Sequence, residues 1–221
     1  MQFDIITIFP DFFTSPFKYG VISKAIEKGI IKINIHDLRD YSGNKHRKID
    51  DRPFGGGAGM VFMVEPIYNA LKEIKDEKSH TILLSPSGEL FNQKKAKALS
   101  KKEKIIIICP RYEGVDERVK NFIDEEISIG DYIITGGEPA ALVLVEAISR
   151  YVKGVVGKEE SVKNESFENG LFDYPQYTQP REFMGMKVPE VLLSGNHKKI
   201  EEWRKKKALE ITLKRRGDLI K

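Results

Sequence analysis

The chain contains 221 residues, of which 40% are hydrophobic and 32% charged, as is typical of a folded globular protein. Its first residues, MQFDIITIFP, lack a basic region, and no apolar run approaches the roughly 18–20 residues of a membrane span. The single cysteine, Cys109, excludes an intramolecular disulfide framework and a cysteine-rich zinc site. We therefore expect a cytoplasmic protein.

Short apolar runs bounded by turn residues predict β-strands in the first part of the chain. These runs are residues 3–9, 30–36, 81–85, 104–109 and 131–135. Stretches with helical spacing lie between most of them, at residues 19–28, 65–75, 92–102 and 115–123. This alternation predicts an α/β fold with a mainly parallel sheet and helices on both faces. We assign residues 1–157 to this domain.

The composition changes after residue 157. Residues 158–180 are polar and rich in turn formers, which predicts an interdomain linker or a mobile loop. Residues 181–221 are expected to form a small basic helical domain, with a helix over 197–214 and Trp203 and Leu209 as core contacts. Residues 196–221 hold ten Lys or Arg against four Asp or Glu. A solvated helix and a site for a phosphate backbone both explain this charge.

The stretch DDRPFGGGAGM, from Asp50 to Met60, has glycine at positions 55, 56, 57 and 59. Glycine loses more backbone freedom on folding than any other residue, so this cluster needs a reason. It is not a phosphate-binding P-loop, because no Gly-Lys-Ser/Thr follows. It is not a dinucleotide fingerprint either, because Met60 occupies the place of the third glycine.

Three tight turns follow predicted strands: SPSGE at 85–89, PRYEG at 110–114 and GGEP at 136–139. Ligands of open α/β sheets bind beyond the carboxyl ends of the strands. Together the turns predict a cleft lined by backbone amides and carbonyls, which suits a ligand with many polar edges, such as an adenine nucleoside. The first strand ends in TIFPDFF without glycine, which argues against a Rossmann-type fold.

Four motifs resemble the bacterial tRNA (guanine-N1)-methyltransferase family: DDRPFGGGAGM, RYEGVDERV, SIGDYIITGGE and VPEVLLSGNHKKIEEWR. The resemblance covers nearly the whole chain. It implies methylation of the guanosine immediately 3′ of a tRNA anticodon, with S-adenosylmethionine as the methyl donor. It also implies a SPOUT-type fold with a C-terminal trefoil knot, followed by an all-helical domain, and a homodimer whose active site lies at the subunit interface.

The resemblance implies that the three turns form the cofactor pocket. Its residues would be Leu83, Leu84, Pro110, Tyr112, Glu113, Ile129, Gly130, Asp131, Tyr132, Ile133, Ile134, Gly136 and Gly137. Pro110 departs from the glycine that is common at this position and removes a backbone donor. The chemistry requires no metal, although Mg²⁺ near Glu113 stays open.

The resemblance also implies the catalytic residues. Ring nitrogen 1 of guanine must lose a proton, and the family's base is an Asp before Ser-Phe in the linker. Here that position holds Glu165, in NESF, and Asp173 is the alternative. Arg150 matches the family arginine placed against guanine O6, where negative charge develops.

Substrate contacts are expected around the glycine cluster. By the resemblance, Gly55, Gly57 and Gly59 lie beside the incoming base, where side chains would obstruct it. The upstream residues His46, Arg47 and Arg52 would contact tRNA phosphates. Gln179 stands where the family commonly has Arg, so one such charge is missing.

Two other functions stay open from the sequence. One is a SPOUT methyltransferase that acts on another RNA nucleotide, and the other is a non-catalytic RNA-binding protein. Binding of the methyl donor separates the enzymes from the binding protein, and the position of the methylated atom separates the enzymes.

Overall fold

The computed structural model describes residues 1–157 and 165–220. The chain divides into two compact units, Met1–Gly157 and Lys158–Lys221, and each has its own packing. Within the described residues, no helix is both long and apolar enough to cross a membrane.

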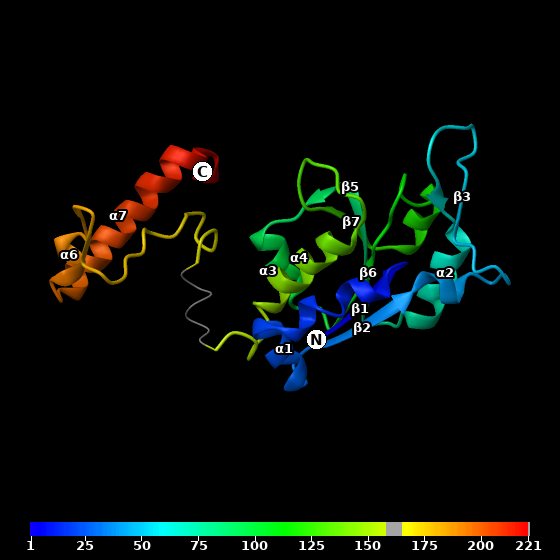
Figure 1. The fold of residues 1–221 in the computed structure, drawn as a ribbon, viewed down its shortest axis with the longest axis horizontal. Helices are drawn as coiled ribbons and strands as arrows, with labels where there is room; N and C mark the ends of the chain where they lie inside the picture. The colour runs from blue at the N-terminus through cyan, green and yellow to red at the C-terminus, as the bar shows by residue number, and fades with distance from the viewer. Residues whose placement is uncertain (158–164, 221) are drawn as a thin grey trace. The chain divides into compact units, whose positions relative to one another are not determined.

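The first unit is built on a five-stranded sheet with the order β2-β1-β6-β5-β7. Its strands are β1 (Gln2–Thr7), β2 (Lys32–Asp37), β5 (Ser79–Leu90), β6 (Lys104–Ile108) and β7 (Glu125–Ser128). All four ladders between them are parallel, which confirms the prediction of a mainly parallel sheet. Figure 1 shows β1, β2 and β6 side by side in the middle of this unit.

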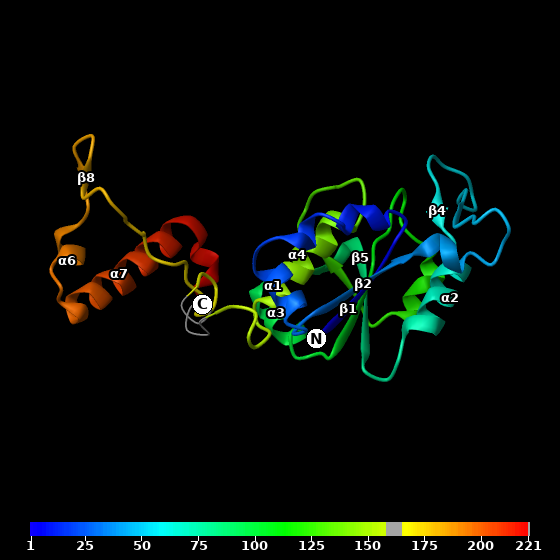
Figure 2. The same cartoon turned by 60° about the horizontal axis from the view of Figure 1, so that its bottom comes forward.

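Helices cover both faces of the sheet (Figures 1 and 2). One face packs against α1 (Gly20–Glu27), α3 (Gln93–Leu99) and α4 (Glu138–Ser149). The other packs against α2 (Val64–Ile74) and the 3₁₀ helices η3 (Leu38–Tyr41) and η4 (Glu117–Phe122). Two further 3₁₀ turns, η1 (Pro10–Phe13) and η2 (Pro16–Lys18), follow β1.

Strand β6 shows why the sequence IIIIC does not alternate in polarity. Ile105 and Ile107 belong to the core on the α4 side, and Ile106 and Ile108 to the core on the α2 side. All four are at most 1% exposed. A strand covered on both faces buries every side chain, so it needs no polar face.

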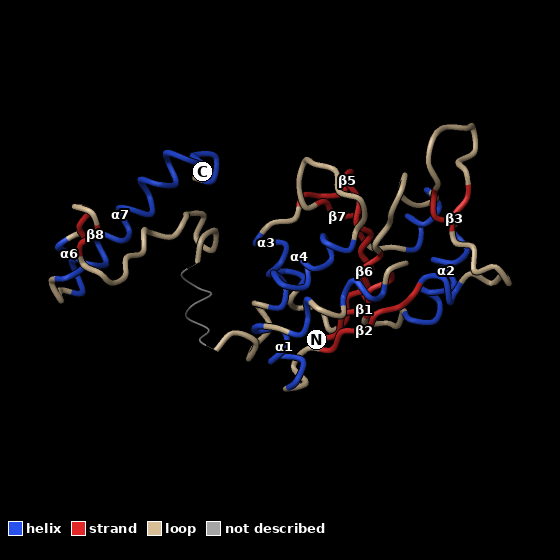
Figure 3. Tube along the Cα trace, viewed as in Figure 1, coloured by secondary structure: helices blue, strands red, loops and turns tan. Residues whose placement is uncertain are grey.

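Two predicted elements were wrong in detail. Residues 131–135 form a loop rather than a strand, and β7 ends at Ser128 (Figure 3). Ile133 is 81% exposed, so the apolar run at this place does not enter the core. Residues 85–88 do not end β5 but form a bulge within it, since pairing with β7 resumes at Glu89.

The second unit contains β8 (Glu182–Phe183), β9 (Met186–Lys187), α6 (Glu190–Leu193), α7 (His197–Arg216) and η5 (Gly217–Leu219). The strands pair as a short antiparallel hairpin (Figure 2), so this unit is not all-helical as predicted. The turn residues Met184 and Gly185 have φ of 49° and 78°, the left-handed conformations that tight hairpins require.

Residues 165–180 pack against α7. The Phe172 N–H donates to Thr212 Oγ1 at 2.8 Å, and the Tyr177 and Trp203 rings lie 6.4 Å apart between centroids. Leu209 is 43% exposed and is therefore no core residue, whereas Ala208 and Thr212 are buried. The described part of the predicted linker thus belongs to the packing of the second unit.

Asp4, in β1, is a buried carboxylate with several polar partners. Asn34 and Gln2 donate to it at 2.8 and 2.6 Å, and His36 Nε2 lies 2.8 Å from its Oδ1. Burial raises the pKa of Asp4, but the hydrogen bonds from His36, Gln2 and Asn34 outweigh burial and hold this pKa below its ordinary value of 3.8.

We predict that Asp4 makes the stability of the first unit depend on acid pH. A depressed pKa in the folded state stabilises above the unfolded pKa, and this contribution is lost as pH falls through the folded pKa. In Asp4→Asn, the free energy of unfolding should fall less steeply below about pH 4 than in the wild type. Urea titrations between about pH 2.5 and 6 measure this slope, with the exposed Asp11→Asn as control. Equal slopes for wild type and Asp4→Asn would contradict the prediction.

Candidate functional site

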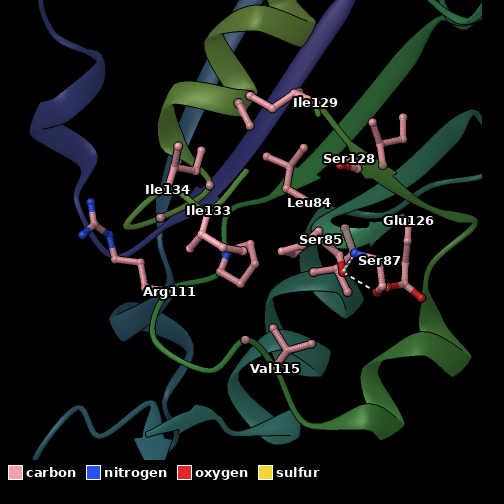
Figure 4. Close-up of a pocket in the computed structure, with 18 of the residues that line it drawn as sticks. Leu84, Ser85, Ser87, Arg111, Val115, Glu126, Ser128, Ile129, Ile133 and Ile134 are labelled. Carbon is pink, nitrogen blue, oxygen red and sulfur yellow. Dashed lines mark hydrogen bonds between the residues drawn. The ribbon is translucent and has the colours of Figure 1, made fainter. Parts of the chain in front are cut away.

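A cavity of about 580 Å³ lies beside the bulge of β5 and the carboxyl ends of β6 and β7. Residues of three segments line it, namely 83–87, 110–120 and 126–140. Its size is within the range of small-molecule sites, roughly 300–1,000 Å³. In Figure 4, Leu84, Ile129 and Ile134 lie toward one part of the cavity, and Ser85, Ser87 and Glu126 toward another.

The segments that follow β6 and β7 pack together with almost no space between their backbones. The Gly137 N–H donates to the Pro110 carbonyl at 2.9 Å, and Arg111 and Gly136 form an isolated antiparallel bridge. A Cβ at Gly137 would lie 2.8 Å from Cys109 Cα, closer than real atoms approach. The glycines at 136–137 therefore permit the contact that closes one wall of the cavity.

Twelve of the thirteen residues predicted to bind the cofactor line this cavity, and Asp131 does not. The lining also includes Ser85, Ser87, Arg111, Val115, Glu126 and Ser128, which were not singled out. The two serines and Arg111 lie within the turns that the sequence did indicate. Glu126 was not indicated, because the predicted strand began at residue 131, six residues after the start of β7 at Glu125.

Arg111 and Glu138 form an ion pair beside the cavity. Arg111 Nε lies 3.3 and 3.2 Å from the two carboxylate oxygens, and Nη2 lies 3.2 Å from Oε2. Glu138 is fully buried and also accepts a hydrogen bond of 2.8 Å from the Thr7 hydroxyl at the end of β1. In Figure 4 the Arg111 guanidinium points away from the other lining residues.

Cys109 lies behind this wall and is fully buried. Burial raises the pKa of its thiol well above the ordinary value, and the charge of Glu138 raises it further. A buried thiol with a raised pKa is a poor nucleophile, so Cys109 serves as a packing residue.

The glycine cluster forms the loop between two short paired strands, β3 (Asp50–Asp51) and β4 (Val61–Phe62). Gly55, Gly56, Gly57 and Gly59 have φ of 86°, 81°, 122° and 85°, a conformation that favours glycine. A Cβ at Gly59 would lie 2.6 Å from Glu113 Oε1. A Cβ at Gly55 or Gly56 would have no other atom within 4 Å. Only the Gly59 end of the loop therefore closes against the cavity segment.

The predicted phosphate contacts lie on the surface outside the cavity lining. His46, Arg47 and Arg52 are exposed. Arg47 forms ion pairs with Asp40 and, at 3.5 Å, with Asp37. These carboxylates reduce the positive charge that Arg47 presents to a phosphate.

Arg150 follows the last residue of α4, whereas Gly137 and Glu138 stand at its beginning. An α-helix of 12 residues is about 18 Å long, so Arg150 lies far from the cavity of its own chain. It is not among the lining residues.

The two candidate bases, Glu165 and Asp173, belong to the second unit. The Asp173 carboxylate accepts hydrogen bonds from the Tyr174 N–H at 2.8 Å and from the Gln176 amide at 3.3 Å. Its own N–H donates to Ser166 Oγ at 2.9 Å. Asp173 thus stabilises a local turn.

Comparison with known proteins identifies the family. The model of the family described as tRNA (Guanine-1)-methyltransferase TrmD matches residues 1–221. The chain belongs to the TrmD family. A tRNA (guanine-N(1)-)-methyltransferase of Dictyoglomus turgidum is 55% identical over 220 residues, covering 100% of this chain and 90% of that protein. The similarly named protein of Clostridioides difficile is 51% identical over 226 residues, covering 100% and 98%.

The cavity of this TrmD family member fits a methyl-donor nucleoside. Residues of three turns, apolar residues and the acidic residues Glu113, Glu117 and Glu126 line it. Lys120 also lines the cavity and pairs with Glu117 at 2.9 Å and with Glu126 at 3.2 Å. A mixed apolar and polar lining of this size suits an adenine nucleoside. Among residues 1–157 and 165–220, no cluster of three or more His, Cys, Asp or Glu is arranged to hold a metal ion.

We predict that Gly137→Ala strains the wall of the cavity by steric overlap alone. Gly137 has φ of −75°, which alanine adopts freely, so the contacts with Cys109 Cα at 2.8 Å, Pro110 Cδ at 3.1 Å and Cys109 C at 3.2 Å are what oppose a methyl group. The substitution should cost about 1–3 kcal/mol of unfolding free energy, measured by urea denaturation. Gly157→Ala, where no atom would lie within 4 Å of the new methyl, is the matched control. Equal stability of the two variants would contradict this account.

Proposed function

We propose that this chain transfers a methyl group from S-adenosylmethionine to ring nitrogen 1 of the guanosine immediately 3′ of the anticodon in tRNA. The observation that carries the proposal is the full-length family match, together with relatives of 51–56% identity that bear the name of this activity. The cavity at the sheet edge supports it, because a nucleoside-sized site is what a methyl donor needs.

The cavity segments would hold the donor. S-adenosylmethionine supplies a methyl group that is already activated by the sulfonium charge. The backbone of residues 129–137 and the turn 110–114 would bind the polar edges of the nucleoside, and Leu84, Ile129 and Ile134 its flat faces. The protein's main task at this site is to hold donor and acceptor in line, which lowers the entropic part of the barrier.

Glu165 would remove the proton from guanine N1. A positioned carboxylate contributes about 10²–10⁴ in rate as a general base. Glutamate has the chemistry of the family's aspartate with one more methylene. Arg150 would stabilise the negative charge that develops on O6, since its planar fork donates two parallel hydrogen bonds.

We infer that the enzyme acts as a homodimer with an active site at the subunit interface. Arg150 lies about 18 Å along α4 from the cavity of its own chain, so another copy of the chain must bring this arginine to the donor. Exposed apolar side chains of the first unit, Tyr19, Ile133 and Val143, are 73%, 81% and 45% exposed and offer contact surface.

We also infer the trefoil knot of the family. Strand β7 lies at the edge of the sheet, beyond β5. Yet the chain that leaves it returns to pack on residues 109–111, and α4 then binds the end of β1 through Glu138 and Thr7. Such a return across neighbouring strands is the path that a knotted chain requires.

The second unit would bind tRNA together with the exposed loop that carries His46, Arg47 and Arg52. In α7 the last turn contains Lys214, Arg215 and Arg216. Neutralised phosphates release counterions, so tRNA binding should weaken as salt rises. This role would place the protein in the cytoplasm, with its substrate.

The decisive experiment is methyl transfer from S-adenosylmethionine to tRNA transcripts with G or A on the 3′ side of the anticodon. We expect methylation of the G transcript at N1, with and without added Mg²⁺. Methylation at another nucleotide would favour the alternative SPOUT activity. Donor-independent tRNA binding without any methylation would leave an RNA-binding protein.

We predict that Glu165→Gln lowers kcat by about 10²–10⁴ while KM for the donor stays nearly unchanged, because the amide cannot accept the N1 proton. Glu165→Asp should retain most of the activity. Single-turnover methylation measures the effect, and Glu168→Gln, in the same turn, is the control. Near-normal turnover of Glu165→Gln would exclude Glu165 as the base.

We predict that Arg150→Lys lowers kcat by about 10²-fold with little change in donor binding. Lysine keeps the charge but loses the planar fork. Donor affinity from calorimetry and kcat from single-turnover assays separate the two effects. Loss of donor binding in parallel with kcat would instead assign Arg150 a role in the fold.

A further inference from the structure

We propose that Arg111 and Glu138 are positioning residues whose ion pair holds the turn of residues 110–114 against the methyl-donor cavity. This inference rests on the proposed function for the identity of the ligand. The pair itself touches the cavity only through Arg111, whose guanidinium points away from it (Figure 4).

The pair fastens the turn to the sheet. Glu138 is the first residue of α4, where the helix dipole favours a carboxylate. Thr7, at the end of β1, donates to Glu138 and accepts from the Phe9 N–H at 2.9 Å. The Arg111 guanidinium lies between this carboxylate and the Phe9 ring, with 4.3 Å from Cζ to the ring centroid. Arg111 is thereby fixed from two sides.

The neighbouring glycine leaves room for this pair. A Cβ at Gly136 would lie 2.6 Å from Glu138 Oε2 and 2.7 Å from Arg111 Nε. Gly136 does not have the left-handed φ that would otherwise demand glycine. The absence of a side chain at Gly136 therefore serves the ion pair.

The turn of residues 110–114 contains unfavourable backbone geometry. Tyr112 has φ of 57°, which is unfavourable for a bulky side chain, and Gly114 has φ of 100°. Tyr112 is 56% exposed and contacts Phe62 only edge-on, at 5.9 Å between centroids. Backbone hydrogen bonds from Gly114 N–H to the Arg111 carbonyl and from Glu113 N–H to the Met60 carbonyl close the turn. Without the ion pair, we expect Tyr112 to relax and to take Glu113 away from the cavity.

The alternative is that the pair only stabilises the first unit, since removing one partner of a buried pair is destabilising wherever it lies. The two roles make different predictions for donor binding at equal loss of stability. A variant that destabilises the same unit far from the cavity is therefore the control. Ile22→Ala in α1 serves, because Ile22 is 3% exposed and does not line the cavity.

The test compares Glu138→Gln, Arg111→Lys and Ile22→Ala in the full-length protein. Glu138→Gln retains an acceptor for Thr7 but loses the charge, and Arg111→Lys retains the charge but loses the fork. We expect KM and Kd for S-adenosylmethionine to rise between about tenfold and 100-fold in Glu138→Gln, and less in Arg111→Lys. At saturating donor, kcat should stay within about threefold of the wild type, as for lost ground-state binding. Ile22→Ala should lower the melting temperature without changing Kd.

A second measurement needs no donor. The amide resonances of residues 112–114 in the unliganded protein should shift or broaden in Glu138→Gln but not in Ile22→Ala. Unchanged resonances, or an equal rise of Kd in Ile22→Ala at the same melting temperature, would overturn the proposal. If the wild type binds no donor, the proposed function fails, while the resonances still test the positioning role.

Discussion

The close packing of the backbone after β6 against the backbone after β7 is the constraint on which the site depends. Gly137 contacts Cys109 and Pro110 where no side chain fits. This contact draws the chain from the sheet edge back across β5 and forms one wall of the cavity. It also sets Glu138, the next residue, at the end of β1, where Thr7 binds it. The glycines at 136–137 thus determine both the wall of the cavity and the position of Glu138.

Under the proposed function, the backbone of the segments that line the cavity would bind the polar edges of the donor. Backbone groups are held by the sheet and cost little further ordering when a ligand binds, which favours affinity and alignment. Ile133 lines the cavity and is 81% exposed, so it also offers apolar surface to a neighbouring molecule. Under the proposed function, this cavity holds the donor and Glu165 of the second unit supplies the base.

Sequence reasoning recovered the parts that local chemistry dictates. The run IIIIC predicts a strand buried on both faces, and β6 is such a strand. The turn at 110–114 locates the cavity because glycine and proline mark the end of β6. The turn at 136–139 also lies at the cavity, but it precedes α4 and does not end a strand. The run DYIIT was misassigned because strand propensity reports hydrophobicity, whereas here the apolar side chains line a cavity or stay exposed. The bulge at 85–88 depends on pairing with β7, which no local pattern contains.

The Arg111–Glu138 pair lay beyond sequence reasoning for a different reason. Its members are 27 positions apart, and each alone is an ordinary charged residue beside a turn. The two side chains meet only because the chain returns from β7 to the end of β1, and this return depends on the topology of the fold. A glutamate at 0% exposure needs such partners, because a buried carboxylate without them is strongly destabilising. The same return of the chain therefore builds the cavity and brings Arg111 and Thr7 to the buried carboxylate of Glu138.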